Sequence, residues 1–280
     1  MFIRAILLLQ FPHVTMILRE LSKRKDYIVF KGGTSLSKCH KAIKRFSEDI
    51  DITIDTKISQ SQMKNLKETI KDIADSLGLS ITNIDETRSR RSYNKYILKY
   101  RSVFPKINDT IPTAVLMETS FAEVSFPTVL QPVTSYIGEY IGKTNPVELQ
   151  EYGLEPFEMK VQGLDRTLID KVFAICDYYL TGQIAKHSRH IYDIHKLLSL
   201  VPLTEEFKAL VEEVRKVRAE TAICPSAQPG IDISRLLETI IETNAYEDDY
   251  ENITTQILEE NVSYETAIKA VSVIARSEMF

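Results

Sequence analysis

The chain has 280 residues, of which 44% are hydrophobic and 26% are charged, and its formal net charge is −4. These values are typical of an ordinary folded protein with one large domain or two small ones. The negative net charge argues against a uniformly basic nucleic-acid-binding surface but is compatible with a local basic patch. Cys39, Cys176 and Cys224 are far apart and lack metal-binding spacing. We therefore expect reduced thiols and a cytoplasmic protein.

The first residues are apolar without being long enough to cross a membrane. No run of about 18 apolar residues occurs, so we expect no membrane partner. Residues 2–11 superficially look like a signal peptide, but a clean basic region and a small-residue cleavage site are missing. We interpret residues 1–24 as a helical segment that packs in the core, broken near Pro12.

A strand, a turn, a helix and a second strand are predicted next. Residues 27–30 are an apolar run typical of a short strand, and Gly32 and Gly33 interrupt it. Residues 36–45 predict a helix and residues 50–54 a second strand. Because side chains alternate between the faces of a strand, Asp49 and Asp51 are expected on one face and the isoleucines on the other.

The residues of this stretch are those of a metal and phosphate site. Two carboxylates on one face repel each other unless a divalent cation lies between them. The alternative is a chance pair on a solvent-facing strand edge. Backbone N–H groups at the start of the helix suit a phosphate, so we assign four consecutive residues and one upstream hydroxyl to a nucleotide: Gly32, Gly33, Thr34, Ser35 and Ser47. The alternatives are a tight turn in which Thr34 or Ser35 caps the helix, and a Ser47 hydroxyl that bonds local backbone.

The run from Lys31-Gly-Gly-Thr-Ser-Leu to Arg45-Phe-Ser-Glu-Asp-Ile-Asp51 resembles the polymerase-beta-type nucleotidyltransferase superfamily. It is most similar to the AbiEii/AbiGii toxin family of type IV toxin–antitoxin systems, which resembles the MenT toxins. The resemblance implies a nucleoside triphosphate substrate, Mg²⁺ or Mn²⁺ as the cofactor, and a separately encoded antitoxin. In the MenT branch the acceptor is the 3′ end of tRNA.

A third carboxylate usually completes such a metal site from a neighbouring strand. Residues 113–121 predict a buried strand that returns beside the Asp49 strand. Glu118 interrupts this apolar strand, where an unpaired charge would be costly, so we assign Glu118 as a third metal ligand, with Glu123 as the competing candidate.

Between these strands lies a basic and aromatic stretch, residues 88–106. Its cations suit RNA phosphates, and Tyr93, Tyr96 and Tyr100 are candidates for stacking on bases. The alternative is a solvated face with tyrosines packed in a sheet. Positive charge on the predicted helix would extend the patch through Lys38, Lys41, Lys44 and Arg45.

The predicted fold class is α+β, with an N-terminal nucleotidyltransferase-type mixed sheet flanked by helices and a C-terminal helical bundle. A helix is predicted over residues 60–77, ending at Gly78. Residues 127–160 contain four prolines and read as irregular, so we place a nucleotidyltransferase domain at 1–155 and a helical domain at 156–280. Helices are predicted in the second domain over residues 164–180, 190–201, 205–222, 233–245 and 250–277.

Two charged residues of the helical domain are assigned to the active site. Lys171 lies inside an apolar helix, so its ammonium must reach solvent or an anion. The AbiEii and MenT pattern has a Lys on one C-terminal helix and an Asp near the start of the next, which Lys171 and Asp193 match. The resemblance implies that Lys171 contacts the triphosphate. The alternative is a buried ion pair of Lys171 with Asp170 or Asp193. Arg189 is a candidate to pair with Asp193 or to hold a phosphate.

The sequence thus predicts a Mg²⁺-dependent nucleotidyltransferase toxin. Four residues are expected to be catalytic: Asp49, Asp51, Lys171 and Asp193. The expected acceptor is RNA, at the 3′ end of tRNA. One alternative is a toxin that transfers the nucleotide to a protein hydroxyl, and another is a regulatory module that binds nucleotide without turnover.

Overall fold

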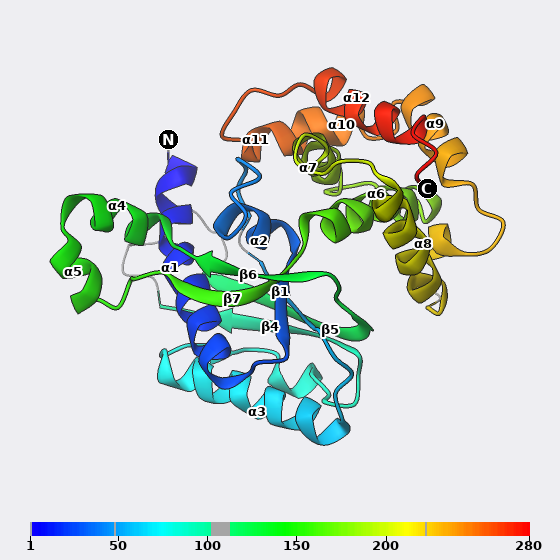
Figure 1. Cartoon of the computed structure of the whole chain (residues 1–280). Coiled ribbons are helices and arrows are strands. Elements are labelled where there is room, and N and C mark those ends of the chain that lie inside the picture. Colours follow the sequence, from blue (N-terminus) through cyan, green and yellow to red (C-terminus); the bar gives the residue numbers. More distant parts are fainter. Residues whose placement is uncertain (1, 48, 102–112, 222) are drawn as a thin grey trace. The chain divides into compact units, whose positions relative to one another are not determined.

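The computed structural model describes residues 2–47, 49–101, 113–221 and 223–280, with the backbone alone described at 2–11, 122 and 123 (Figure 1). Two compact units can be separated. The sheet unit comprises residues 1–40 and 47–162, and the helical unit comprises residues 41–46 and 163–280. The predicted α+β class, with a mixed sheet followed by helices, is confirmed.

The described residues of the sheet unit form a seven-stranded mixed sheet with the strand order β3-β4-β5-β2-β1-β7-β6. β1 pairs antiparallel with β2 and parallel with β7, and β2 pairs parallel with β5. The strands are β1 (Ile28–Lys31), β2 (Ile50–Ile54), β3 (Ser80–Ile81), β4 (Tyr93–Lys99), β5 (Ala114–Val124), β6 (Thr128–Val133) and β7 (Phe157–Gln162). The predicted return of a strand beside the Asp49 strand is therefore confirmed in β5.

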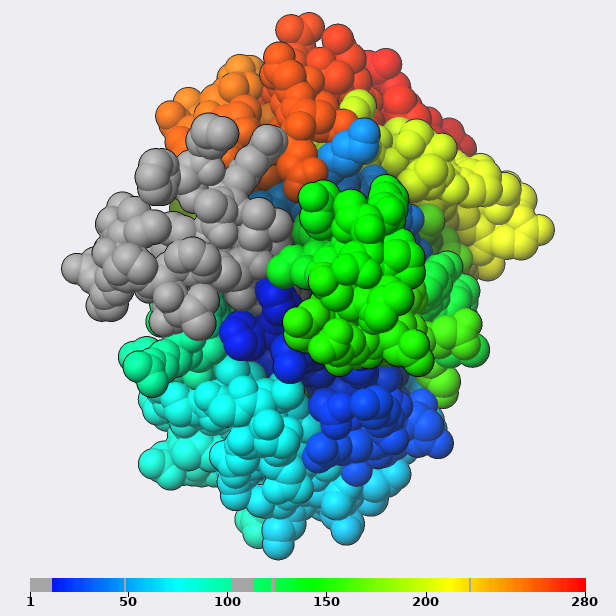
Figure 2. All heavy atoms as spheres, turned by 90° about the vertical axis from the view of Figure 1, so that its left-hand side faces the viewer, coloured from blue at the N-terminus to red at the C-terminus, as the bar shows by residue number. Residues whose placement is uncertain are grey.

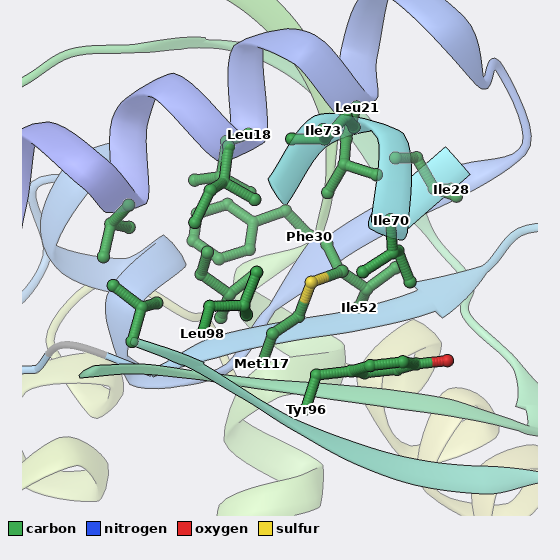
Figure 3. Packing of buried hydrophobic residues seen from close by; sticks show 14 of the residues in the cluster. Leu18, Leu21, Ile28, Phe30, Ile52, Ile70, Ile73, Tyr96, Leu98 and Met117 are labelled. Atoms are coloured by element: carbon green, nitrogen blue, oxygen red, sulfur yellow. The ribbon is translucent and has the colours of Figure 1, made fainter. Parts of the chain in front are cut away.

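One face of this sheet is the core. Alternate residues of the central strands, such as Phe30, Ile52 and Met117, are fully buried there. The helices α1 (Phe2–Arg24) and α3 (Gln60–Ser76) cover that face, and Figure 3 shows Leu18 and Ile70 pointing toward the strand residues. The surface of α3 lies beside the second half of α1 in Figure 2. With one face apolar and covered, the opposite face is the one left for polar side chains.

Local sequence signals explain the ends of α3. Ser59 and Gln62 form a reciprocal capping box at its start, which satisfies two backbone N–H groups. Gly78 follows its end with φ +66°, a conformation that glycine adopts without a steric penalty. The prediction of a helix over 60–77 is confirmed. By contrast, α1 continues through Pro12, where a break was predicted.

The helical unit contains α6 (Leu164–Leu180), α7 (Arg189–Leu198), α8 (Glu205–Ala219), α9 (Ile233–Glu242) and α12 (Tyr264–Ala275). α7 packs against α6 and α12, and α12 also packs against α9. Tyr246 is fully buried, and its hydroxyl donates to the carbonyl of Ile175 at 2.6 Å. The shorter segments are η2 (Pro225–Ala227), α10 (Glu247–Asp249), η3 (Tyr250–Thr254) and α11 (Thr255–Ile257).

Two predicted helices are wrong in the same way. The helix predicted over 36–45 is α2 (Gly32–Lys38), and the helix predicted over 250–277 is interrupted after Ile257. The segment 44–46 instead runs beside 257–259: Phe46 N donates to Ile257 O at 2.8 Å, and Glu259 N donates to Lys44 O at 2.8 Å. Backbone groups that a helix would use internally are thus paired between two distant segments.

Residues 127–160 are also more regular than predicted. They contain β6, α4 (Tyr136–Thr144), α5 (Pro146–Glu151) and the start of β7. Pro132 is tolerated because β6 is an edge strand, and Pro146 occupies the first position of a helix. β7 completes the sheet, so the sheet unit extends to residue 162, and residues 41–46 belong to the helical unit.

Among the described residues, no helix is long and apolar enough to cross a membrane. The cysteines are buried thiols.

The position of Phe30 in the middle of the core predicts a large loss of stability on truncation. Phe30→Ala should lower the free energy of unfolding by about 3–5 kcal/mol, because it leaves a cavity among α1, α3 and the sheet. Tyr152→Ala, which removes an exposed aromatic ring of the same unit, is the matched control. Urea denaturation followed by circular dichroism measures both, and equal losses would contradict this account of the core.

Candidate functional site

A glycine of the predicted turn lies directly against a predicted metal ligand. Lys31 is in register with Asp51 across the β1–β2 pair, and the chain turns at Gly32 with φ +78°. A Cβ atom at Gly32 would overlap the Asp51 carboxylate, whose Cγ would be 2.8 Å away. Gly32 is therefore required both by the left-handed backbone and by the close approach of a carboxylate.

The sheet register continues this arrangement into a row of charged residues. Asp51 is opposite Glu118 on β5, and Glu118 is opposite Lys95 on β4. Residues opposite each other share a face, so the row Lys95–Glu118–Asp51–Lys31 runs across four strands with its two carboxylates in the middle. Asp51 points away from the core because its neighbours Ile50 and Ile52 are buried in it. Asp49 directly precedes β2 and, like Asp51, is half-buried.

The hydroxyls of the turn are committed to local hydrogen bonds. Ser47 and Thr34 are joined at 2.9 Å between their hydroxyl oxygens, so the structure brings the predicted upstream serine to the turn. The Ser35 hydroxyl donates to the carbonyl of Gly32 at 2.9 Å. Neither Thr34 nor Ser35 caps α2, whose N-cap is Lys31 without a side-chain bond. The helix-capping alternative is therefore wrong. Thr34 and Ser35 are buried, so their hydroxyls are not presented to solvent.

Glu118 lies opposite Asp51, where a third metal ligand was predicted, and its carboxylate contacts Lys95. Its carboxylate is 3.4 Å from the ammonium of Lys95, and its side chain is 33% exposed. Within the described part of the chain, no three His, Cys, Asp or Glu side chains gather closely enough to hold a metal ion. The side chain of Glu123 lies outside the described ones. The register supports Glu118 as a neighbour of Asp51, and its role as a ligand is still a prediction.

The helical unit contains a separate cluster around Asp193. Arg45 donates to both carboxylate oxygens of Asp193, from Nε at 2.6 Å and from Nη2 at 2.8 Å. The Lys171 ammonium is 3.0 Å from Asp193 Oδ2 and 3.1 Å from His190 Nδ1. Asp193 is fully buried and Arg45 is 2% exposed. The ion pair predicted as the alternative for Lys171 is present, and Asp193 is its partner.

Burial and charge set the protonation of this cluster. Burial alone would raise the pKa of Asp193, but Arg45 and Lys171 hold that pKa well below its ordinary value. Burial lowers the pKa of Lys171, and the Asp193 carboxylate opposes this shift. Burial, with Lys171 beside it, lowers the pKa of His190 well below its ordinary value, so the neutral ring accepts from Lys171. With Arg45 and Lys171 cationic and Asp193 anionic, the cluster has an excess of one positive charge.

Several neighbours of this cluster are aromatic or basic. His187 stacks on Tyr178 with ring centroids 3.5 Å apart, as expected for a helix-packing histidine. Arg189 is half-buried at the start of α7. Both oxygens of Asp193 bond Arg45 and Lys171, so Arg189 is not its partner as one alternative suggested.

The predicted RNA-binding patch is smaller than the sequence suggests. Tyr96 and Tyr100 are 2% and 6% exposed and pack in the core, so they are not available to stack on bases. Tyr93 is 49% exposed. Lys38 and Arg45 are buried, so they do not extend the patch, whereas Lys41 and Lys44 are exposed. Lys106 lies outside the described residues.

Arg45 is the residue of the cluster whose role sequence reasoning missed. It precedes the Asp49–Asp51 pair by a few residues and was interpreted as a surface cation of a helix. The available signal was its context: Ala42 and Ile43 before it are apolar and buried, and a charged side chain in such a segment needs a partner.

Comparison with known proteins identifies a family and a shared fold. The profile of the family described as "Nucleotidyl transferase AbiEii toxin, Type IV TA system" matches residues 17–270. Among solved structures, MenT4, a nucleotidyltransferase toxin from Mycobacterium tuberculosis H37Rv, superposes with a TM-score of 0.58. The two sequences are 16% identical, and the match covers 96% of this chain and 82% of the other. A search of curated proteins gives no match. The structural likeness shows a shared fold.

The contact of Gly32 with Asp51 predicts a specific cost for an added methyl group. Gly32→Ala should lower the free energy of unfolding more than Gly78→Ala does. Both positions have positive φ. A Cβ at Gly32 would clash with the Asp51 carboxylate, whereas nothing lies within 4 Å of a Cβ at Gly78. Thermal and urea unfolding of the two variants provides the comparison, and equal losses would show that backbone strain alone accounts for the effect.

The cluster around Asp193 predicts a pH-dependent contribution to stability. Asp193→Asn should lower the free energy of unfolding at neutral pH by about 3–5 kcal/mol, because two buried cations lose their shared anion. Arg45→Gln should cost less, since Lys171 still pairs with Asp193. Because the pKa of Asp193 is lowered on folding, its contribution is present above the unfolded pKa and is lost as pH falls through the folded pKa.

Chemical denaturation at a series of pH values tests this prediction. The difference between wild type and Asp193→Asn should be constant from neutral pH down to mildly acidic pH and should shrink only in strongly acidic solution. Glu265→Gln, which breaks an exposed pair with Lys269, serves as the control and should change little. A difference that is already lost near neutral pH would contradict the assignment of Asp193 as a deeply stabilised anion.

Proposed function

Since the chain belongs to the AbiEii nucleotidyltransferase toxin family of type IV toxin–antitoxin systems, we propose that it transfers a nucleotide from a nucleoside triphosphate to RNA, with the 3′ end of tRNA as the acceptor. The observation that carries this proposal is the contact between the Gly32 turn and the Asp51 carboxylate. It joins the glycine turn at the start of α2 to one carboxylate of the Asp49–Asp51 pair, and a phosphate-binding turn beside metal-binding carboxylates is the combination that nucleotidyl transfer requires.

The donor nucleotide is proposed to lie over the turn. Gly32 and Gly33 have no side chains, so a phosphate can approach their backbone closely. The buried hydroxyls of Thr34, Ser35 and Ser47 hold the turn in shape through bonds to each other and to Gly32. We therefore propose a backbone role for the glycines and a positioning role for the three hydroxyls, which differs from direct phosphate contact by all five residues.

The carboxylates are proposed to hold the divalent cation. Asp49 and Asp51 supply oxygen donors, which Mg²⁺ and Mn²⁺ prefer, and Glu118 adds a third oxygen donor in register with Asp51. Their donor set fits such an ion. When bound, a divalent cation neutralises phosphate charge and makes an acceptor hydroxyl more acidic. Glu118 must leave Lys95 to join the set, so it is proposed as the weakest of the three ligands.

The chemical step is an in-line displacement at the α-phosphorus. The acceptor hydroxyl oxygen forms a bond to this phosphorus, the bond to the oxygen that bridges to the β-phosphate breaks, and pyrophosphate leaves. The hydroxyl proton passes to a nearby base or to water. Here the protein contributes position and charge stabilisation, which account for most of phosphoryl-transfer catalysis.

Lys171 is proposed to neutralise the triphosphate in the same reaction. Its cluster carries an excess positive charge, which favours an anion, and burial strengthens the field of such a charge. Asp193 is fully buried and fully bonded, so we propose that it positions Lys171 rather than touching the acceptor. Arg45 completes this support by holding Asp193 through two hydrogen bonds.

Toxicity is proposed to follow from modification of RNA in the cytoplasm, opposed by a separately encoded antitoxin. Transfer to a protein hydroxyl would use the same carboxylates and donor. A module that binds nucleotide without turnover would use the same carboxylates and cations, and the formation of a labelled product is what distinguishes it from an enzyme. The exposed Tyr93 and basic side chains of β4 favour RNA over protein as the acceptor.

Labelling with single nucleoside triphosphates tests the proposal. Purified protein is incubated with Mg²⁺, each triphosphate labelled at the α-phosphate, and total cellular RNA and protein. We expect label in a tRNA-sized band with wild type, and a loss of at least about a hundredfold with Asp51→Asn and with Asp49→Ala. Lys171→Met should reduce labelling and raise KM for the triphosphate.

Asp72→Asn, which changes an exposed carboxylate on α3, is the matched control and should label RNA as wild type does. Label in a protein band would overturn the RNA acceptor. Bound nucleotide without any labelled product would overturn turnover itself. Full activity of Asp51→Asn would overturn the site.

A further inference from the structure

The face of the sheet that carries Asp51 extends onto β4, where its side chains have a different character. Lys95 is opposite Glu118, and Tyr93 is opposite Ser120, so Tyr93 and Lys95 share the face of the carboxylate row. Tyr93 is 49% exposed and the Lys95 side chain is 43% exposed. In contrast, the alternate residues Asn94 and Tyr96 are buried. An exposed aromatic ring and a cation thus stand beside the carboxylates.

The order of the strands places Tyr93 and Lys95 on the side of Asp51 that is opposite to the Gly32 turn. β1 and the Gly32 turn lie on one side of Asp51, whereas β5 and then β4 lie on the other. In an in-line displacement the attacking oxygen and the leaving oxygen are on opposite sides of the phosphorus. If the triphosphate occupies the turn, the acceptor has to approach from the side of β5 and β4.

The distance between Tyr93 and Asp51 matches the size of a terminal nucleotide. Tyr93 is two strands from Asp51, at about 4.8 Å per strand, and two residues along, at about 3.4 Å per residue, which places its Cα roughly 12 Å from that of Asp51. A terminal nucleotide with its hydroxyl near the carboxylates therefore reaches the ring with its base.

We propose that Tyr93 and Lys95 form the acceptor-binding surface of β4, with Tyr93 stacking on an unpaired base at the 3′ end of a single-stranded RNA and Lys95 contacting its phosphate. This inference rests on the proposed function, since it takes nucleotide transfer at Asp49 and Asp51 as given. Aromatic stacking with a neighbouring cation is how proteins bind single strands without a sequence code, and a paired base in a helix cannot stack in this way.

The Lys95–Glu118 contact gives the surface a second property. A phosphate that draws Lys95 away would release Glu118, which is in register with Asp51. The acceptor would then add Glu118 to the carboxylate set as it binds. Loss of Lys95 should lower the affinity for RNA, because one phosphate contact is removed.

The test uses an RNA hairpin with a single-stranded 3′ overhang that ends in the fluorescent base 2-aminopurine. Wild type should quench this base on binding, because stacking on an aromatic ring quenches it. Tyr93→Ala should abolish the quenching and raise Kd and KM for the RNA at least about fivefold, with KM for the triphosphate unchanged. Tyr93→Phe should retain both the quenching and the affinity.

Tyr140→Ala removes another exposed tyrosine, from α4 of the same unit, and should behave as wild type. Lys95→Gln gives an independent measurement, since one lost phosphate contact should reduce the slope of log Kd against log salt by about 0.7. Lys71→Gln, from an exposed ion pair on α3, is its control and should leave the slope unchanged.

Three outcomes overturn the inference, and the first two are distinguishable from failure of the proposed function. If wild type labels RNA but Tyr93→Ala binds and quenches the overhang like wild type, the β4 surface is wrong and the transfer stands. If a blunt hairpin binds as well as the overhang, the unpaired base is not what is recognised. If wild type labels protein and not RNA, the proposed acceptor fails together with this inference.

Discussion

The arrangement of the sheet unit depends on one close approach, that of the Gly32 backbone to the Asp51 carboxylate. It requires the antiparallel register of β1 with β2, because a shift by one residue would turn Asp51 into the core and Ile52 out of it. The buried isoleucines of β2 therefore fix where the carboxylate points. The same strand register therefore determines both the packing of the core on one face of β2 and the position of Asp51 on the other face.

That constraint explains which predictions succeeded. The glycine turn, the Asp49–Asp51 pair and the strand 50–54 are encoded within a few residues of each other, through backbone freedom at glycine and alternation along a strand. The position of Glu118 beside Asp51 was predictable because a charge in an apolar strand needs a reason. The contact of Glu118 with Lys95 was not predictable. It depends on the register between two strands, which the sequence of either strand alone does not determine.

Long-range pairing explains the failures. Arg45 and Asp193 are separated by 148 positions, so no local pattern connects them, and the helix predicted over 36–45 placed Arg45 at the surface. In the structure, residues 44–46 pair with 257–259, which replaces the predicted helix there and interrupts the one predicted over 250–277. Local propensity is a weak preference that such tertiary pairing overrides. The strand β6 was missed for a different reason, because a proline that suggests a loop also fits an edge strand.

The buried pair of Arg45 and Asp193 has a consequence for the segment 41–46 of the helical unit. A bidentate pair in which both side chains are buried permits little movement of Arg45, because displacing it would leave an unpaired charge in the interior. The backbone on both sides of Arg45 is also paired, since Phe46 N donates to Ile257 O and Glu259 N donates to Lys44 O. A rigidly held arginine thus keeps the segment 44–46 beside 257–259. Stabilisation of Lys171 and restraint of this segment are in this way two effects of a single carboxylate, that of Asp193.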